Sequence, residues 1–196
     1  MPGADHTKMM LAQSLQELMT TMPLEKISVN NIVEHAGMGR NTFYYHFEDK
    51  YDLVNWYFQT GMTHFLTSRI DHGNWQSILQ NVEDYLRENR VFYINALSYS
   101  GQNSLRSYIF DFSRDMFIQR TRERLKETSD TMTPEELHFA GDFAAGAIMG
   151  ILLYWVDHGM KEHIADYYRC LQKLLGGVIF SLPEKTEEDE DAPVPG

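Results

Sequence analysis

The sequence predicts an all-α protein, and three observations support this prediction. Apolar residues recur at three- and four-residue spacing along most of the 196-residue chain. No segment alternates between apolar and polar residues, as a half-buried strand would. With 43% apolar and 13% aromatic residues, the chain can bury a substantial core. We therefore expect helices packed on helices, in one compact unit or in two small fused units.

The stretch from Ser28 to Lys50 contains two short helical patterns on either side of Gly37. The first pattern begins at Ser28, whose hydroxyl can cap the free amides of a first helical turn. Gly37 supplies the left-handed backbone conformation that reverses the chain. In the second pattern, Phe43 and Phe47 lie four residues apart and face the core, which leaves polar side chains on the remaining surface. This layout is typical of a helix-turn-helix that reads DNA.

The residues around this motif show a more specific pattern. An amphipathic helix is expected over residues 7–22, Lys26 and Ile27 precede the first short helix, and AGMGRNTFYYHFEDKYDLV follows over residues 36–54. In these features the first quarter of the chain resembles the TetR family of one-component bacterial regulators. Weaker similarity later in the chain, including RVFY at residues 90–93, resembles a subgroup with activators of dihydroxyacetone kinase operons. The resemblance implies a three-helix DNA-binding domain over residues 1–52 and a helical effector-binding and dimerisation domain over residues 53–183.

The resemblance also implies a set of DNA-contacting residues. Four occupy positions that hold phosphates or orient the recognition helix, and these are Thr42, Tyr44, His46 and Lys50. Three occupy positions that face the base edges, and these are Arg40, Asn41 and Tyr45. Asn30 lies at a position of the first short helix that approaches DNA. Because arginine suits the two acceptors of guanine and asparagine suits adenine, we expect a half-site that contains both bases.

The charge of the chain is unusual for a protein that binds double-stranded operator DNA. The net charge is −11, and residues 1–56 contain four lysine or arginine residues against seven acids. We therefore expect modest non-specific DNA affinity, with specific binding supported by neutral phosphate contacts. The low basic charge also leaves open a co-regulator that acts through a protein partner. Residues 184–196 are expected to be a disordered acidic tail.

Helix signals continue through the rest of the chain. Helical patterns cover residues 49–68, 75–89, 90–99 and 102–126, with glycines and asparagines between them. Thr133 followed by Pro134 and Glu136 is a strong start signal, because it combines a hydroxyl cap, a first-turn proline and a capping box. That helix is expected to run to Gly159, and a last helix is expected over residues 162–182.

Small and aromatic residues near the end of the chain suggest a dimer interface. The small residues at 146–150 would let another helix backbone approach closely, although the same pattern also fits an intramolecular core. The resemblance favours a homodimer formed by the last two long helices, and a two-fold pair would read two half-sites. The dimerisation residues we expect are Gly146, Gly150, Tyr154, Tyr167, Leu171 and Leu175.

Aromatic residues are frequent in the middle of the chain, and most are expected to be core. A few polar groups among them also fit a pocket for a small-molecule effector. The candidate ligand-binding residues are Tyr93, Asn95, Tyr99, Tyr108, Phe112, Met116 and Phe143.

Several other classes of function find no support in the sequence. The eight histidines have no metal-ligand spacing, and no serine or cysteine lies in a nucleophile motif. We therefore expect no enzyme activity, no metal and no cofactor. The single cysteine, Cys170, fits a reducing cytoplasm. The longest apolar run, residues 143–156, is shorter than a bilayer-spanning helix, so no membrane association is expected.

Overall fold

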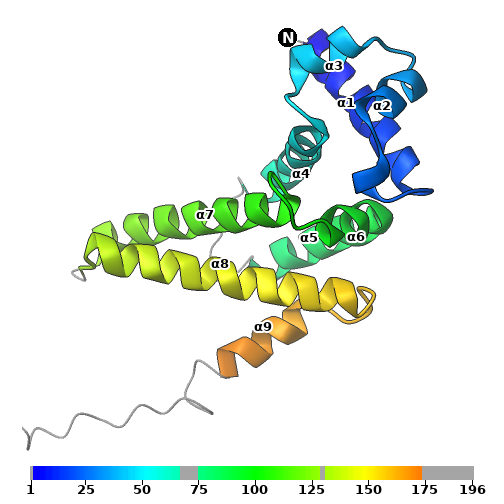
Figure 1. Ribbon diagram of the computed structural model, residues 1–196. Coiled ribbons are helices and arrows are strands. Elements are labelled where there is room, and N and C mark those ends of the chain that lie inside the picture. Colours follow the sequence, from blue (N-terminus) through cyan, green and yellow to red (C-terminus); the bar gives the residue numbers. More distant parts are fainter. Residues whose placement is uncertain (1, 67–74, 129–130, 174–196) are drawn as a thin grey trace, which may run out of the picture.

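The computed structural model describes residues 2–66, 75–128 and 131–173 of the chain (Figure 1). All regular elements in this described part are helices, which confirms the predicted all-α class. The N-terminal helices α1 to α3 lie at the end of the molecule opposite α9, and α4 leads from them toward the other helices (Figure 1). This arrangement separates a small N-terminal unit from a larger helical unit.

The N-terminal unit contains α1 (Pro2–Met19), the 3-10 turn η1 (Leu24–Lys26), α2 (Val29–His35) and α3 (Arg40–His46). Helix α1 begins five residues before the expected start at residue 7, and it packs against α2 and against α4. The side chains of Leu11, Leu15, Ile32 and Phe43 are fully buried between these helices. This small apolar core fixes the position of α3 relative to the rest of the unit.

The turn between α2 and α3 has the geometry that its residues predict. Ser28 caps α2 by accepting a hydrogen bond from the Asn31 amide, and the Asn31 side chain accepts one from the Ser28 amide. Gly37 adopts a φ of +66°, which lies in the left-handed region that favours glycine. The Met38 amide then donates to the carbonyl oxygen of Val33 at 2.7 Å, which closes the end of α2.

The larger unit contains α4 (Lys50–Leu66), α5 (Trp75–Glu88), α6 (Arg90–Ser98), α7 (Leu105–Glu127), α8 (Pro134–Asp157) and α9 (Ile164–Lys173). Helices α7 and α8 form a long side-by-side pair, and α9 lies beyond α8 (Figure 1). Helix α7 begins three residues later than expected, because Asn103 has a φ of +59° and Ser104 caps the helix. The predicted Thr133 capping box at the start of α8 is confirmed.

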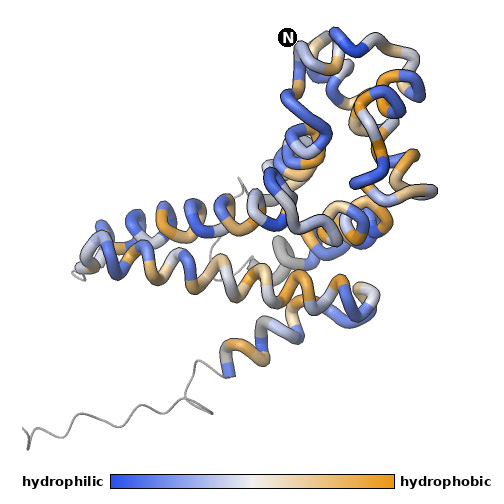
Figure 2. Tube along the Cα trace, in the orientation of Figure 1, coloured by the Kyte–Doolittle hydropathy of each residue, from blue (hydrophilic) through white to orange (hydrophobic). Residues whose placement is uncertain are grey.

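Helix α8 differs from the expectation drawn from its apolar run. Its 24 residues are long and apolar enough to cross a membrane by length and composition, whereas the apolar run at residues 143–156 alone is too short. Only 28% of its most apolar window is buried within the chain. Figure 2 shows that the C-terminal half of α8 is mostly white and orange. The helix therefore presents apolar side chains both to the core and to the outside.

Candidate nucleic-acid interface and effector site

Helix α3 presents most of the predicted DNA-contacting residues on its outer face. Arg40, Asn41, Tyr44 and Tyr45 are exposed, and the side chain of Tyr45 is 83% accessible. Thr42 and His46 are half-buried on the flanks of the helix, and Asn30 is exposed in the first turn of α2. A helix with this accessible polar surface can enter a major groove.

Arg40 is positioned by a residue one helical turn away. Its guanidinium carbon lies 5.8 Å from the centre of the Tyr44 ring, and a guanidinium nitrogen lies 3.5 Å from the Tyr44 hydroxyl oxygen. Contact between an arginine and an aromatic face restricts the freedom of a long side chain. Tyr44 thus holds the arginine along the helix face that the two residues share.

The inner face of α3 is anchored by aromatic side chains. Phe43 packs against Phe47 with ring centres 5.8 Å apart, and Phe47 packs against Trp56 of α4 at 5.7 Å. The Lys8 ammonium lies 5.7 Å from the Phe47 ring and 5.5 Å from the Trp56 ring. Lys8 places a positive charge beside the end of the recognition helix. No local sequence pattern predicts this position of Lys8, because its partners lie about forty residues or more further along the chain.

In this structure Lys50 binds backbone carbonyl oxygens around η1, which fits the second of its two expected roles, orienting the recognition helix. Its ammonium group donates to the carbonyl oxygens of Leu24 at 2.7 Å, Glu25 at 2.9 Å and Ile27 at 2.7 Å. Burial lowers the pKa of Lys50, while the charges of Glu25 and Asp49 oppose this change. Because an ammonium group has three N–H donors and all three are used, Lys50 holds η1 against α4 rather than reaching outward to a phosphate.

The candidate ligand-binding residues lie in more than one place within the part of the chain that the structure describes. Three of them surround the buried ring of Phe58 on α4, with ring centres 6.4 Å from Tyr93, 6.1 Å from Tyr108 and 6.2 Å from Phe112. Met116 is half-buried one turn further along α7. These four residues remain candidates for an effector site.

Three other candidates lie away from Phe58. Asn95 binds the backbone between α1 and α2, and Tyr99 stacks on Tyr51 of α4 with ring centres 4.4 Å apart. Burial and a hydrogen bond with Tyr99 raise the pKa of Tyr51 to about 12. Phe143 is 52% exposed on the outer face of α8. Aromatic spacing along a helix could not separate inward from outward positions here, because both faces of α8 are apolar.

Tyrosine hydroxyls gather inside the larger unit next to Phe58. Tyr93 is completely buried, and its hydroxyl makes no hydrogen bond of good geometry with the described residues, although the Tyr85 side chain lies close enough to interact with it. Burial raises the pKa of Tyr93 well above its ordinary value, and the neighbouring Tyr85 and Tyr57 add to this shift. The hydroxyl of Tyr85 lies where a side chain on Gly61 would begin, only 2.0 Å from an ideal Cβ position. Glycine at this position of α4 therefore allows Tyr85 to reach the interior.

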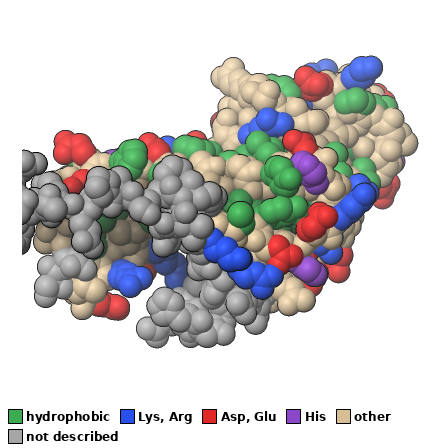
Figure 3. Space-filling view, turned by 90° about the horizontal axis from the view of Figure 1, so that it is seen from below, with side chains coloured by type: hydrophobic (Ala, Val, Ile, Leu, Met, Phe, Trp, Pro, Cys, Tyr) green, Lys and Arg blue, Asp and Glu red, His purple; other side chains and the backbone are tan. Residues whose placement is uncertain are grey.

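The expected dimerisation residues gather on the outer face of α8 and on α9. Gly146 and Gly150 are exposed, and a Cβ atom on either would meet nothing within 4 Å. Tyr154 is 51% exposed and packs against Tyr167 of α9 with ring centres 5.3 Å apart. Leu171 is half-buried, and Leu175 lies outside the described residues. Figure 3, a view from below Figure 1, shows hydrophobic side chains gathered on the surface between charged ones.

Comparison with known protein families identifies the family of this chain. Residues 16–56 match the family described as bacterial regulatory proteins of the tetR family, and residues 73–177 match a transcriptional regulator C-terminal region of that family. The second match alone covers more than half of the chain. The chain belongs to the TetR family of bacterial regulators. It is therefore a transcriptional regulator, and its α2–α3 motif is the DNA-binding helix-turn-helix of the family.

Individual relatives agree with this assignment. A dhaKLM operon transcriptional activator, DhaS, of Lactococcus lactis is 31% identical over 87 residues, which cover 44% of this chain and 46% of that protein. A helix-turn-helix transcriptional regulator of Staphylococcus aureus is 33% identical over 107 residues, covering 48% of this chain and 58% of that protein. The chain thus matches about half the length of these curated relatives. One of them is a dhaKLM operon activator, which is the subgroup that the sequence resembles.

Solved structures share the fold of the chain over most of its length. A dihydroxyacetone kinase operon activator DhaS aligns with a TM-score of 0.60 and 22% identity, covering 88% of this chain and 96% of that one. A FadR repressor from Thermus thermophilus, solved with lauroyl-CoA, aligns with a TM-score of 0.61 and 15% identity, covering 96% and 99%. The two-unit helical architecture is therefore that of TetR-family regulators.

Proposed function

We propose that this TetR-family regulator binds its operator as a homodimer, and that a small molecule held in its helical unit controls this binding. The exposed polar face of α3 supports the proposal that the protein binds DNA. The proposal for an effector is supported by the buried Tyr93 hydroxyl, which makes no hydrogen bond of good geometry with the described residues, because a buried polar group without such a bond is costly unless a ligand or water satisfies it. Operator binding places the protein with the chromosome in the cytoplasm.

The exposed apolar face of α8 supports the homodimer. Phe143, Gly146, Gly150 and Tyr154 follow one another at three- and four-residue spacing on the outside of this helix. An exposed apolar stripe of this kind usually marks an interaction surface. A two-fold pairing through α8 and α9 would cover it, and the same pairing would present two copies of α3 to successive major grooves.

The decisive experiment is a DNA-binding assay with the purified protein alone. A fragment from upstream of its own gene should be retarded at low salt, and an unrelated fragment of equal length should not. The competing hypothesis is a co-regulator that needs a protein partner, which the low basic charge of residues 1–56 also fits. Retardation that appears only after a cell extract is added would favour that hypothesis.

Arg40→Ala is expected to relax base preference at one position of each half-site. Arg40 is exposed and is held by Tyr44 at the start of α3, where it can donate two hydrogen bonds to one guanine. Losing such a contact costs about 1–3 kcal/mol of discrimination against the wrong base. Competition assays with single-base operator variants measure this loss.

Lys26→Ala is the matched control, because it also removes one positive charge but lies in η1, away from α3. It should weaken binding to all operator variants by similar factors. An Arg40→Ala protein that discriminates among the variants as the unaltered protein does would show that another residue reads this base.

Tyr93→Phe is expected to leave the free protein unchanged or to stabilise it. The change removes a buried hydroxyl that makes no hydrogen bond of good geometry with the described residues, and such a group costs about 1–3 kcal/mol. For a chain of this size, 1 kcal/mol corresponds to about 2–4 °C in melting temperature. Thermal unfolding followed by circular dichroism measures the effect. A lower melting temperature would show that the hydroxyl is already satisfied and would remove the main support for an effector at Tyr93.

A further inference from the structure

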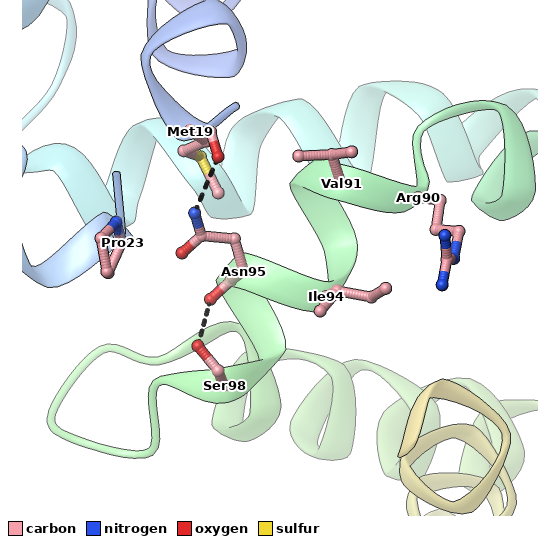
Figure 4. A pocket seen from close by; sticks show the side chains of 7 residues that line it. All are labelled: Met19, Pro23, Arg90, Val91, Ile94, Asn95 and Ser98. Atoms are coloured by element: carbon pink, nitrogen blue, oxygen red, sulfur yellow. Dashed lines mark hydrogen bonds between the residues drawn. The ribbon is translucent and has the colours of Figure 1, made fainter. Parts of the chain in front are cut away.

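The backbone between α1 and α2 is held by one side chain of the larger unit. The side-chain oxygen of Asn95 accepts a hydrogen bond from the Leu24 amide at 2.7 Å. Its side-chain nitrogen donates to the carbonyl oxygens of Met19 at 3.1 Å and Met22 at 2.9 Å. Asn95 lies on α6, more than seventy residues further along the chain. Figure 4 shows its amide directed toward Met19.

The first residue of α4 also binds this backbone segment, through carbonyl oxygens. Lys50 donates to the carbonyl oxygens of Leu24, Glu25 and Ile27. Leu24 therefore connects two elements, because its amide donates to Asn95 and its carbonyl oxygen accepts from Lys50. This connection runs from α6 through the turn to the start of α4, which directly follows the recognition helix α3.

Helix α6 carries both the buried tyrosine of the candidate effector site and the residue that holds the turn. Tyr93 lies inside the larger unit against Phe58, and Asn95 lies two residues later, facing α1. A shift of α6 caused at Tyr93 would therefore move Asn95. An open pocket of about 380 Å³ between the end of α1 and α6 borders these hydrogen bonds (Figure 4). Its residues are Met19, Pro23, Arg90, Val91, Ile94, Asn95 and Ser98.

We propose that Asn95 is a positioning residue through which α6 sets the orientation of the DNA-reading helices. The inference rests on the proposed function, since it assigns a residue to the coupling between effector and operator. Other contacts cross the junction: Asn89, for example, accepts hydrogen bonds from Gln16 at 3.2 Å and Tyr57 at 3.1 Å. These bonds hold the helices α1 and α4 themselves, whereas Asn95 holds the turn that Lys50 links to α4.

The first test measures the orientation of the two units within one chain. Spin labels are placed on the exposed positions of α2 and α7 by Glu34→Cys and Arg122→Cys, after the exposed Cys170 is removed by Cys170→Ser. Labelled chains are mixed with an excess of unlabelled chains, so that pairs within one chain dominate. Double electron–electron resonance spectroscopy should give a narrow distribution of distances between the two spin labels in the otherwise unaltered protein. Asn95→Leu, which keeps the side-chain size and removes all three hydrogen bonds, should widen the distribution about twofold.

A second variant and a control separate positioning from general stability. Asn95→Asp retains the acceptor for Leu24 but sets a carboxylate against the two carbonyl oxygens, so it should also widen the distribution. Ser98→Ala is the control, because the Ser98 hydroxyl of the same helix donates only within α6, to the Asn95 carbonyl oxygen. Circular dichroism should show unchanged helix content for all three variants at the measurement temperature. Narrow distributions for both Asn95 variants would overturn the proposal.

The second test measures binding to the fragment from upstream of the gene. If looser coupling leaves about one molecule in ten with the binding geometry, the apparent affinity falls about tenfold. Asn95→Leu should show this loss, and Ser98→Ala should remain within about twofold of the unaltered protein. Failure of the unaltered protein to bind DNA would contradict the proposed function, while the distance measurement would still decide the role of Asn95. Equal DNA affinities of the unaltered protein and Asn95→Leu would contradict the coupling itself.

Discussion

Replacing Gly150 with arginine is expected to convert the proposed dimer into a monomer. Gly150 lies on the exposed face of α8, and the two-fold pairing would bury it against the partner helix. A buried charge without a partner costs about 3–5 kcal/mol. Because a two-fold interface contains each residue twice, the cost applies twice. At about 1.4 kcal/mol per factor of ten, the dissociation constant should rise by about ten-thousandfold or more. Light scattering across a concentration series measures this change.

The single chain itself should tolerate Gly150→Arg. A Cβ atom at this position meets nothing within 4 Å, so the larger side chain causes no clash inside the chain. Glycine is also a poor helix former, so arginine should slightly stabilise α8 as a helix. The variant should therefore remain folded while it loses the dimer, and circular dichroism distinguishes these two effects.

Two further glycine substitutions serve as controls. Gly150→Ala keeps the face small and should leave the dimer intact. Gly141→Ala lies on the buried face of the same helix, where the new Cβ would lie 2.8 Å from the Cγ1 atom of Ile118. It should lower the melting temperature without acting on the association of two chains directly. An unchanged dimer for Gly150→Arg would exclude this face of α8 as the interface.

The sequence was sufficient for the features that depend on neighbouring residues. Ser28 and Thr133 mark the starts of α2 and α8 correctly, because a capping hydroxyl bonds to amides only three residues away. Gly37 likewise marks the turn before α3, since its positive φ is a local requirement. Phe43 and Phe47 are buried as predicted, because their spacing places them on one face of a short helix.

Features that depend on distant residues could not be predicted in this way. The partners of Asn95 and Tyr99 in α1, η1 and α4 depend on the packing of α6 against the N-terminal unit, which no local pattern shows. Phe143 looked buried, but it lies on the outer face of a helix that is apolar on both sides. Helical spacing defines a face of a helix, and only the tertiary arrangement decides what that face contacts.

Lys50→Met is expected to lower the stability of the protein. It is not expected to remove a contact between the protein and a DNA phosphate. The substitution removes three hydrogen bonds from a charged group to the carbonyl oxygens of Leu24, Glu25 and Ile27. Hydrogen bonds to charged groups contribute about 1.5–3 kcal/mol in proteins. Water can replace part of this, because Lys50 is only half-buried. A net loss of about 2–3 kcal/mol should lower the melting temperature by roughly 4–12 °C.

Lys26→Met is the matched control for this substitution. Lys26 is an exposed lysine of η1, so the control removes the same charge without breaking the bonds between η1 and α4. Its melting temperature should change by less than about 2 °C, as is usual for surface substitutions with an effect within about 0.5 kcal/mol.

The salt dependence of DNA binding separates the two roles of Lys50. A lysine that contacts a phosphate releases counterions, and its loss lowers the slope of log affinity against log salt by about one unit per contact. Because the ammonium of Lys50 is fully used by carbonyl oxygens, the slope of Lys50→Met should equal that of the unaltered protein, measured well below the melting temperature. A slope reduced by one unit per chain, with an unchanged melting temperature, would show that Lys50 leaves η1 and grips a phosphate when DNA binds.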